Sequence, residues 1–513
     1  MRKSRLISVL LCLLALCCLF TSCNKNATDT TTPEGTPEVT TTERTRPTYT
    51  IVTTKKEPSP SEMPNDALVL IGGVNITSYK IVYNDTPLKD RAGSMTNKTI
   101  GEDIGEFLQG EEKACDFDYQ SAVRLQQLIK DRYGYELEIV SDTVAKDPSR
   151  YEIIVGLADK RTAASRLEYG LLETEYACSI DTLTTVKTQY VICGGSYGAT
   201  WHAIDELEKF FDQNPMESIN GAIDLTSVSV TKGSYDFKNV ACIGDSITRG
   251  SQGLPDGDTY ANANSLTRQF GSNATGVYLE QYLSYPATLQ RELWKDYIVY
   301  NYGQGWASMI DYFPGQKDTG PYYYNDTTKF KNCLTLSNRD DFEFDAVLMM
   351  LGTNDASKMK ANMKADELET LTADFLADAK NLVDQILVGS PNAKIVMMNA
   401  PHRCDGDSEN VKDTAMREIQ KNIATTLKAS GYKIYHYDME AYTIENLGTG
   451  CGNTKETEEK AHEDYYNILT DAGGPDRTHP NYRGYGKIAE GMIDLLAYVL
   501  EDAQAPKYMI NIG

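Results

Sequence analysis

The stretch Asn239-Val-Ala-Cys-Ile-Gly-Asp-Ser-Ile-Thr248 decides the fold of the C-terminal half of the chain. Its continuous apolar run predicts a strand buried on both faces, and the turn after it leads toward a helix. Similar apolar runs follow, separated by segments with helical spacing, at 297–302, 346–351, 393–399 and 433–437. The helical segments are 285–294, 366–387, 411–430 and 485–500. This alternation predicts an α/β domain with a mostly parallel five-stranded sheet that helices cover on both faces.

Polar segments follow the predicted strands at the places where such a sheet forms its ligand crevice, outside the carboxyl ends of the strands. Three of them end the first, second and third strands, and the fourth lies after the fifth strand and before the last helix. They read Gly244-Asp-Ser-Ile-Thr248, Asn301-Tyr-Gly-Gln-Gly305, Gly352-Thr-Asn-Asp355 and Asp476-Arg-Thr-His-Pro480.

Three residues of these segments fit the nucleophile, base and orienting acid of acyl transfer. A serine hydroxyl needs a base to remove its proton, and a carboxylate best holds that base in one tautomer. Ser246 stands at the turn after the first strand, and Asp476 precedes His479 by three residues. The Asp476 carboxylate can then accept the Nδ1–H of His479 while Nε2 faces Ser246. We therefore expect a catalytic triad of these residues.

Other residues of the same segments fit the donors that stabilise the oxyanion of acyl transfer. Such donors must be in place before charge develops. The backbone N–H of Ser246 faces the crevice, and Asn354 offers a side-chain amide. Gly305 or Gly303 offers a backbone N–H that a substrate can approach closely, because no side chain intervenes. The expected oxyanion hole is Ser246, Gly305 and Asn354, with Gly303 as the alternative glycine.

Together, the Gly-Asp-Ser, Gly-Thr-Asn-Asp and Asp-Arg-Thr-His segments resemble the SGNH (GDSL-type) hydrolase family of esterases and lipases, over about 239–500. The resemblance implies a flavodoxin-like three-layer α/β/α fold. It also implies Ser246 as nucleophile and first oxyanion donor, Asn354 as another donor, and His479 and Asp476 as base and orienting acid. The glycine block departs from the family's Asn-x-Gly-x-x-Gly, because here it reads Asn301-Tyr-Gly-Gln-Gly-Trp306.

The N-terminus has the pattern of a bacterial lipoprotein signal. Three basic residues precede an apolar run over 6–20, which is too short for a comfortable membrane span, and small residues lead into Cys23. The end of this run resembles a lipobox, which implies a signal peptide over 1–23 and lipidation of Cys23, with soluble secretion as the alternative. We expect an extracellular protein on the bacterial cell surface whose only link to the membrane is this anchor.

Between the signal and the catalytic region, the sequence predicts a tether and a second domain. Residues 24–66 are rich in Thr, Pro and Glu and cannot bury a core. Residues 67–235 alternate strand-like and helix-like segments, which predicts an accessory α/β domain; the catalytic domain is then 236–513. Parts of 151–161 and 194–203 resemble the domain that precedes the catalytic barrel in hexosaminidase- and glucuronidase-like enzymes. A generic α/β packing domain is the alternative.

Charge and cysteine spacing restrict the partners that we expect. A formal net charge of −23 disfavours nucleic acid and other polyanions. Eleven cysteines are present, four of them in the signal, and the other seven have no C-x-x-C spacing. We therefore expect neither a metal nor an organic cofactor, and buried free thiols rather than a disulfide framework, although a Cys404–Cys451 bridge is possible.

The leading hypothesis is a serine esterase that hydrolyses short acyl esters, acetyl above all, on a polysaccharide. A tyrosine-rich insertion supports a sugar-borne ester because aromatic rings stack on sugar faces, although such tyrosines also simply pack together. Its aromatic residues are Tyr312, Phe313, Tyr322, Tyr323 and Tyr324. The alternatives are a lysophospholipase or lipase of the same family and a non-catalytic glycan-binding surface protein.

Overall fold

The computed structural model describes the chain in segments that cover most of both predicted folded domains. These segments are 68–84, 117–147, 150–156, 177–183, 189–215, 222–228, 230–250, 284–312, 321–340, 342–360, 362–403, 407–447, 478–480 and 482–512. The predicted signal, Cys23 and the predicted tether lie outside the described residues, as do Cys404 and Cys451.

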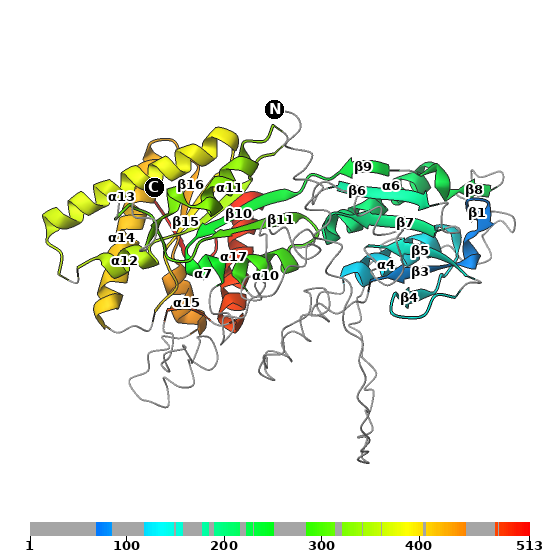
Figure 1. Ribbon diagram of the computed structural model, residues 1–513, viewed down its shortest axis with the longest axis horizontal. Coiled ribbons are helices and arrows are strands. Elements are labelled where there is room, and N and C mark those ends of the chain that lie inside the picture. The colour runs from blue at the N-terminus through cyan, green and yellow to red at the C-terminus, as the bar shows by residue number, and fades with distance from the viewer. Residues whose placement is uncertain are drawn as a thin grey trace, which may run out of the picture. The chain divides into compact units, whose positions relative to one another are not determined.

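A six-stranded sheet forms the centre of the C-terminal domain (Figure 1). Its strand order is β11-β10-β14-β15-β16-β17, and its first five strands run parallel. The order of these five, counted along the chain, is 2-1-3-4-5, which is the flavodoxin-like arrangement. The strands are β10 (Lys238–Gly244), β11 (Tyr297–Gly303), β14 (Ala346–Met350), β15 (Lys394–Met398), β16 (Ile434–Tyr437) and β17 (Met509–Ile510).

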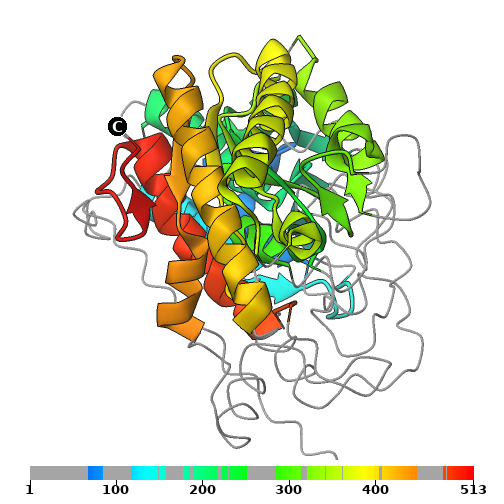
Figure 2. The same ribbon diagram turned by 90° about the vertical axis from the view of Figure 1, so that its left-hand side faces the viewer.

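Helices cover both faces of this sheet because successive strand residues point to opposite sides. Ala241 and Ile243 pack with the helices of one face, whereas Val240 and Cys242 pack with those of the other. The first face carries α11 (Thr328–Ser337), α13 (Ala365–Gly389) and α14 (Asp407–Ala429), and the second carries α10 (Tyr285–Glu292), α15 (Met439–Leu447) and α17 (Tyr482–Glu501). Figure 2 shows α13 and α14, in yellow and orange, side by side. The three-layer α/β/α fold is confirmed.

The structure adds elements that the sequence pattern did not predict. Strand β17 pairs antiparallel with β16 and makes a sixth strand, so the expected count of five was too low. It consists of two residues, which is too short for a hydrophobic period to appear. Helices α11 and α15 were also not predicted, and neither was α12 (Thr353–Lys358), whose Gly-Thr-Asn-Asp start reads as a turn.

The predicted N-terminal domain contains a second, mixed sheet. Strands β4, β3, β5 and β7 run parallel to one another. Strand β6 then pairs antiparallel with β7, and β9 pairs antiparallel with β6. A small sheet, β2-β1-β8, lies in the same domain. The strands of both sheets are β1 (Leu68–Ile71), β2 (Val74–Asn75), β3 (Tyr79–Tyr83), β4 (Ile139–Ser141), β5 (Tyr151–Val155), β6 (Ala177–Leu183), β7 (Gln189–Gly194), β8 (Ala222–Asp224) and β9 (Val230–Ser234). Helices α4 (Phe117–Tyr133) and α6 (Tyr197–Gln213) pack together beside the larger sheet, within one apolar core.

Cysteines of the described segments are free and buried: Cys178, Cys193, Cys242 and Cys333. Burial raises the pKa of the Cys178 thiol to about 11 and that of Cys242 further, which keeps both protonated at neutral pH. None of the helices in the described segments combines the length and the apolar character that crossing a bilayer requires.

Candidate active site

Ser246 begins the short helix α7 (Ser246–Arg249) directly after β10, at the point where the strand order reverses. Asp245 caps this helix, and its Oδ1 accepts the N–H of Ile247 at 2.9 Å. Gly244 is required by close packing, since a Cβ there would lie 2.0 Å from Thr248 Oγ1. The turn thus holds Ser246 half-exposed above a buried strand end.

His479 reaches Ser246 from a loop 233 residues further along the chain. Its Nε2 lies 2.8 Å from Ser246 Oγ, which is hydrogen-bonding distance for a base and its nucleophile. The structure therefore brings these two predicted residues together. The expected orienting acid, Asp476, lies outside the described residues.

The two candidate glycines after β11 have different surroundings. The Gly303 N–H donates to Asn301 Oδ1 at 2.9 Å, and a Cβ on Gly303 would lie 2.1 Å from the backbone nitrogen of Arg249. Gly303 is thus needed for close backbone packing, and its donor is already used. In the part of the chain that the structure describes, the Gly305 N–H donates to no acceptor, and a Cβ on Gly305 would be 3.2 Å from Arg249 Nη1.

Asn354 follows β14 at the start of α12, after Gly352, which has a φ of +130°. Its amide Nδ2 donates to the backbone oxygen of Ala307 at 2.8 Å. A side-chain amide carries two N–H donors, so one fixes the orientation of the group and the other is left for a ligand. Ser246, Gly305 and Asn354 thus follow three neighbouring parallel strands of one sheet.

Asp355 anchors the loop after β11, a role that its sequence context did not reveal. Its fully buried carboxylate accepts the N–H of Met309 at 2.9 Å and that of Ile310 at 3.4 Å. Burial raises the pKa of Asp355 to about 7, and the two backbone donors oppose this rise. Burial also raises the pKa of Asp245, opposed by the Ile247 N–H and by nearby positive charge.

Trp306, directly after Gly305, has an unusual backbone conformation and exposure. Its φ is +61°, a region that favours glycine, and its side chain is 66% exposed. The Ala307 N–H bonds Gln304 O at 3.2 Å, so Trp306 is the third residue of a tight turn. A non-glycine residue in the left-handed region costs on the order of 1–2 kcal/mol. The sequence feature that could have pointed to this residue is the Gly305-Trp306 pair in the glycine block.

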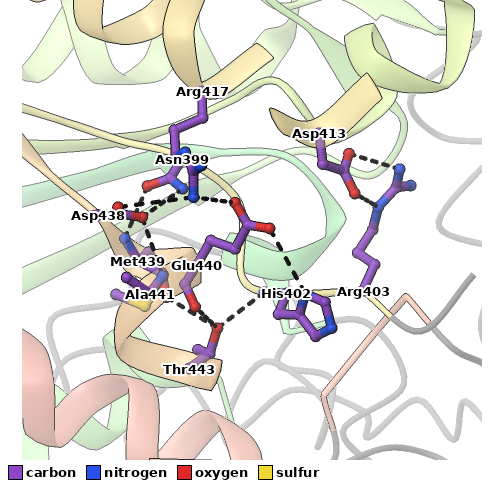
Figure 3. Close-up of polar contacts among 10 residues, drawn as sticks. All are labelled: Asn399, His402, Arg403, Asp413, Arg417, Asp438, Met439, Glu440, Ala441 and Thr443. Carbon is purple, nitrogen blue, oxygen red and sulfur yellow. Dashed lines mark hydrogen bonds and ion pairs between the residues drawn. The ribbon is translucent and has the colours of Figure 1, made fainter. Parts of the chain in front are cut away.

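A polar cluster fixes the loop after β15 (Figure 3). The His402 N–H donates to Thr443 Oγ1 at 2.9 Å, and His402 Nδ1 lies 3.7 Å from a Glu440 carboxylate oxygen. Arg403 forms a bidentate pair with Asp413 of α14, with N–O distances of 2.9 and 2.8 Å. Of the two roles open to His402, a crevice lining and a loop contact, these bonds support the second.

The other histidines do not contribute to the site within the described segments. His202 Nδ1 lies 2.8 Å from Asp205 Oδ2 in the N-terminal domain. Burial lowers the pKa of His436 to about 4, so that it stays neutral at physiological pH. His462 lies outside the described residues.

The tyrosines of the insertion mostly pack against the protein. Tyr324 is fully buried and its hydroxyl donates to Tyr302 O at 2.8 Å, while the Tyr323 hydroxyl donates to Asp378 at 2.9 Å. Tyr312 packs against the apolar core, and Phe313 lies outside the described residues. Packing, which was the alternative to sugar stacking, therefore accounts for these three tyrosines.

Groups of three or more His, Cys, Asp or Glu arranged as metal ligands do not occur in the described segments. The groups that these segments bring together after the strand ends are instead a serine hydroxyl, an imidazole and N–H donors.

The match to a protein-family model agrees with this fold. Residues 240–492 match the family model described as GDSL-like Lipase/Acylhydrolase. No curated protein matches the chain. Solved structures that match part of this chain include a family two carbohydrate esterase from Clostridium thermocellum in complex with cellohexaose, with 16% identity, coverage of 53% of this chain and 68% of that one, and a TM-score of 0.32.

Two further solved structures are similar at the same level. One is a family 2 carbohydrate esterase from Corynascus thermopiles, with 19% identity, coverage of 53% and 69%, and a TM-score of 0.32. The other is an acetyl xylan esterase from the rumen bacterium Butyrivibrio proteoclasticus, with 14% identity, coverage of 53% and 67%, and a TM-score of 0.28. At these values the likeness is no argument about substrate.

Proposed function

Because residues 240–492 form a GDSL-like lipase/acylhydrolase domain, which makes the chain an ester-hydrolysing enzyme, we propose that it removes short acyl groups through Ser246. The observation that carries this proposal is the 2.8 Å separation between His479 Nε2 and Ser246 Oγ. A hydroxyl at this distance from an imidazole nitrogen can lose its proton as it attacks.

In the proposed reaction, His479 takes the hydroxyl proton while Ser246 Oγ attacks the ester carbonyl. The oxyanion accepts hydrogen bonds from the Ser246 N–H, the Gly305 N–H and the second N–H of Asn354. His479 then gives its proton to the departing alcohol, which leaves an acyl-enzyme. Water, deprotonated by His479, attacks this ester and releases the acid and free Ser246.

We propose Asp476 as the carboxylate that accepts the Nδ1–H of His479. It precedes His479 by three residues, and a carboxylate in this place holds the tautomer that has Nε2 free to accept a proton. Asp476→Asn should lower kcat by about 10⁴-fold, as the loss of the correct tautomer does in other triads. Unchanged kcat in this variant would assign the orienting role elsewhere.

We propose an acetyl ester on a polysaccharide as the substrate. Among the described residues, Arg249 ends the helix that Ser246 begins, and Asn354 follows the neighbouring strand. These groups suit a short acyl chain and a hydroxyl-rich alcohol better than a long apolar chain. The predicted lipid anchor at Cys23 would place the enzyme on the bacterial surface, where polysaccharides are accessible; metabolic labelling with a palmitate analogue tests it through Cys23→Ala.

The test is hydrolysis of p-nitrophenyl acetate by the wild type and by Ser246→Ala. We expect Ser246→Ala to lose roughly 10³- to 10⁶-fold in kcat, while the matched control Ser227→Ala, at an exposed serine of the N-terminal domain, retains full activity. Comparable turnover in Ser246→Ala would refute the nucleophile. Chain lengths from acetate to decanoate separate this proposal from a lipase, and fluorophosphonate labelling of Ser246 separates it from a glycan-binding protein.

A further inference from the structure

Trp306 differs from the other exposed large apolar residues in the part of the chain that the structure describes. Those residues are Val144, Val388 and Val411, so the single aromatic ring in the group is Trp306. Its indole makes no ring contact and no hydrogen bond with the protein in the described segments. An indole of this exposure contributes little to the core, yet it stands at a backbone position that favours glycine.

The backbone around Trp306 is held firmly. Its carbonyl accepts the N–H of Tyr322 at 2.7 Å, and the turn closes through the Ala307 N–H. Asn354 binds the oxygen of Ala307, and Asp355 binds the N–H groups that follow it. The ring is therefore carried by a rigid loop, which lowers the entropy cost of binding a ligand to it.

The position of Trp306 ties it to the proposed active site. It directly follows Gly305, whose N–H has no protein acceptor in the described segments, and Gly305 lies against the side chain of Arg249. Arg249 ends the one-turn helix that Ser246 begins. A substrate whose carbonyl oxygen meets the Gly305 N–H would thus have its alcohol or acyl part near the next residue along this loop.

We propose that Trp306 is a specificity-determining residue that stacks against the pyranose ring bearing the ester. This inference rests on the proposed function and names the part of the substrate that it recognises. The apolar C–H face of a sugar covers the flat indole, while the sugar hydroxyls remain in contact with water and neighbouring polar groups.

The exposure of the ring favours a sugar over a long acyl chain. An acyl chain is bound in an enclosed apolar pocket that buries most of its surface. The Trp306 side chain is instead 66% exposed, and its loop carries polar neighbours: Gln304 lies two residues before it, and Arg249 lies against Gly305. A flat, exposed ring on a polar loop fits an amphipathic sugar ring.

The test compares two acetyl esters in Trp306→Gly and Trp306→Phe. Acetylated xylo-oligosaccharide carries a sugar ring, whereas triacetin does not. We expect Trp306→Gly to lower the ratio of kcat/KM for the sugar ester to that for triacetin at least tenfold, mainly through KM, and Trp306→Phe to restore part of it. The Tm of Trp306→Gly should stay within a few degrees of the wild type, because glycine suits this φ.

A matched control and an inactive background separate this inference from the proposed function. Val388→Ala removes an exposed apolar side chain near the C-terminus of α13, which leads into the start of β15. Ser246 and Trp306 instead follow the ends of β10 and β11, so this variant should leave the ratio unchanged. In Ser246→Ala, calorimetry with the same oligosaccharide should show a tenfold higher Kd once Trp306→Gly is added. A wild type inactive on both esters would refute the function, while this Kd change would still support the inference. An unchanged ratio and Kd, or a Tm loss large enough to mark a structural role, would overturn it.

Discussion

Removing the Asn354 side chain tests the oxyanion hole most directly. The Asn354 amide donates one N–H to Ala307 O at 2.8 Å and has a second N–H for the substrate. Losing one preorganised oxyanion donor costs about 2.7–4 kcal/mol of transition-state stabilisation, or roughly 10²- to 10³-fold in kcat. Losing the bond to the buried Ala307 carbonyl costs about 1 kcal/mol of folding free energy. Asn354→Ala should therefore be strongly impaired and only mildly destabilised.

The assay is steady-state hydrolysis of p-nitrophenyl acetate together with urea unfolding. The control is Ser357→Ala, because Ser357 Oγ donates to Asn354 O at 2.7 Å on the exposed side of the same helix. It perturbs α12 without removing a donor from the site. We expect kcat to fall in Asn354→Ala with KM nearly unchanged, and both to persist in the control. A kcat within threefold of the wild type in a folded Asn354→Ala would refute the assignment.

Two further predictions follow from buried groups near the site. Burial raises the pKa of Asp355 from 3.8 to about 7, so the contribution of this residue to stability is full below pH 4 and is lost as pH rises through 7. The loss is at most about 1.4 kcal/mol per pH unit. Asp355→Asn should abolish this slope in urea unfolding between pH 4.5 and 7.5, and an unaltered slope would contradict the prediction. Gly303→Ala should lower both Tm and kcat, because its Cβ would meet Arg249 backbone at 2.1 Å, whereas Gly305→Ala should keep the wild-type Tm; equal Tm values for both would argue against the packing role of Gly303.

Much of the fold of the C-terminal domain could be predicted, because continuous apolar runs in the sequence indicate buried strands locally. The five parallel strands were each predicted within one or two residues of their observed bounds, and helices α10, α13, α14 and α17 within a few residues. The two-residue β17 was missed, since it forms only by pairing with β16. Helix α12 was missed because its first residues also suit a turn.

The candidate site was predictable as a set of residues but not as a set of contacts. The order of the motifs after successive strands placed Ser246 and Asn354 at one sheet edge, since parallel strands end together. The choice between Gly303 and Gly305 depended on which N–H already had an acceptor, and only coordinates display this. The anchoring role of Asp355 likewise appears only where its carboxylate meets a loop 45 residues away.

The amino-acid sequence by itself determined the α/β layering and the identity of the candidate nucleophile and base, because hydrophobic period and motif order are properties of neighbouring residues. Tertiary structure alone decided the 2.8 Å approach of His479 to Ser246, the spare donor of Gly305 and the left-handed backbone of Trp306. The approach of His479 arises where segments distant in sequence pack together, and such packing energies leave no mark on local pattern.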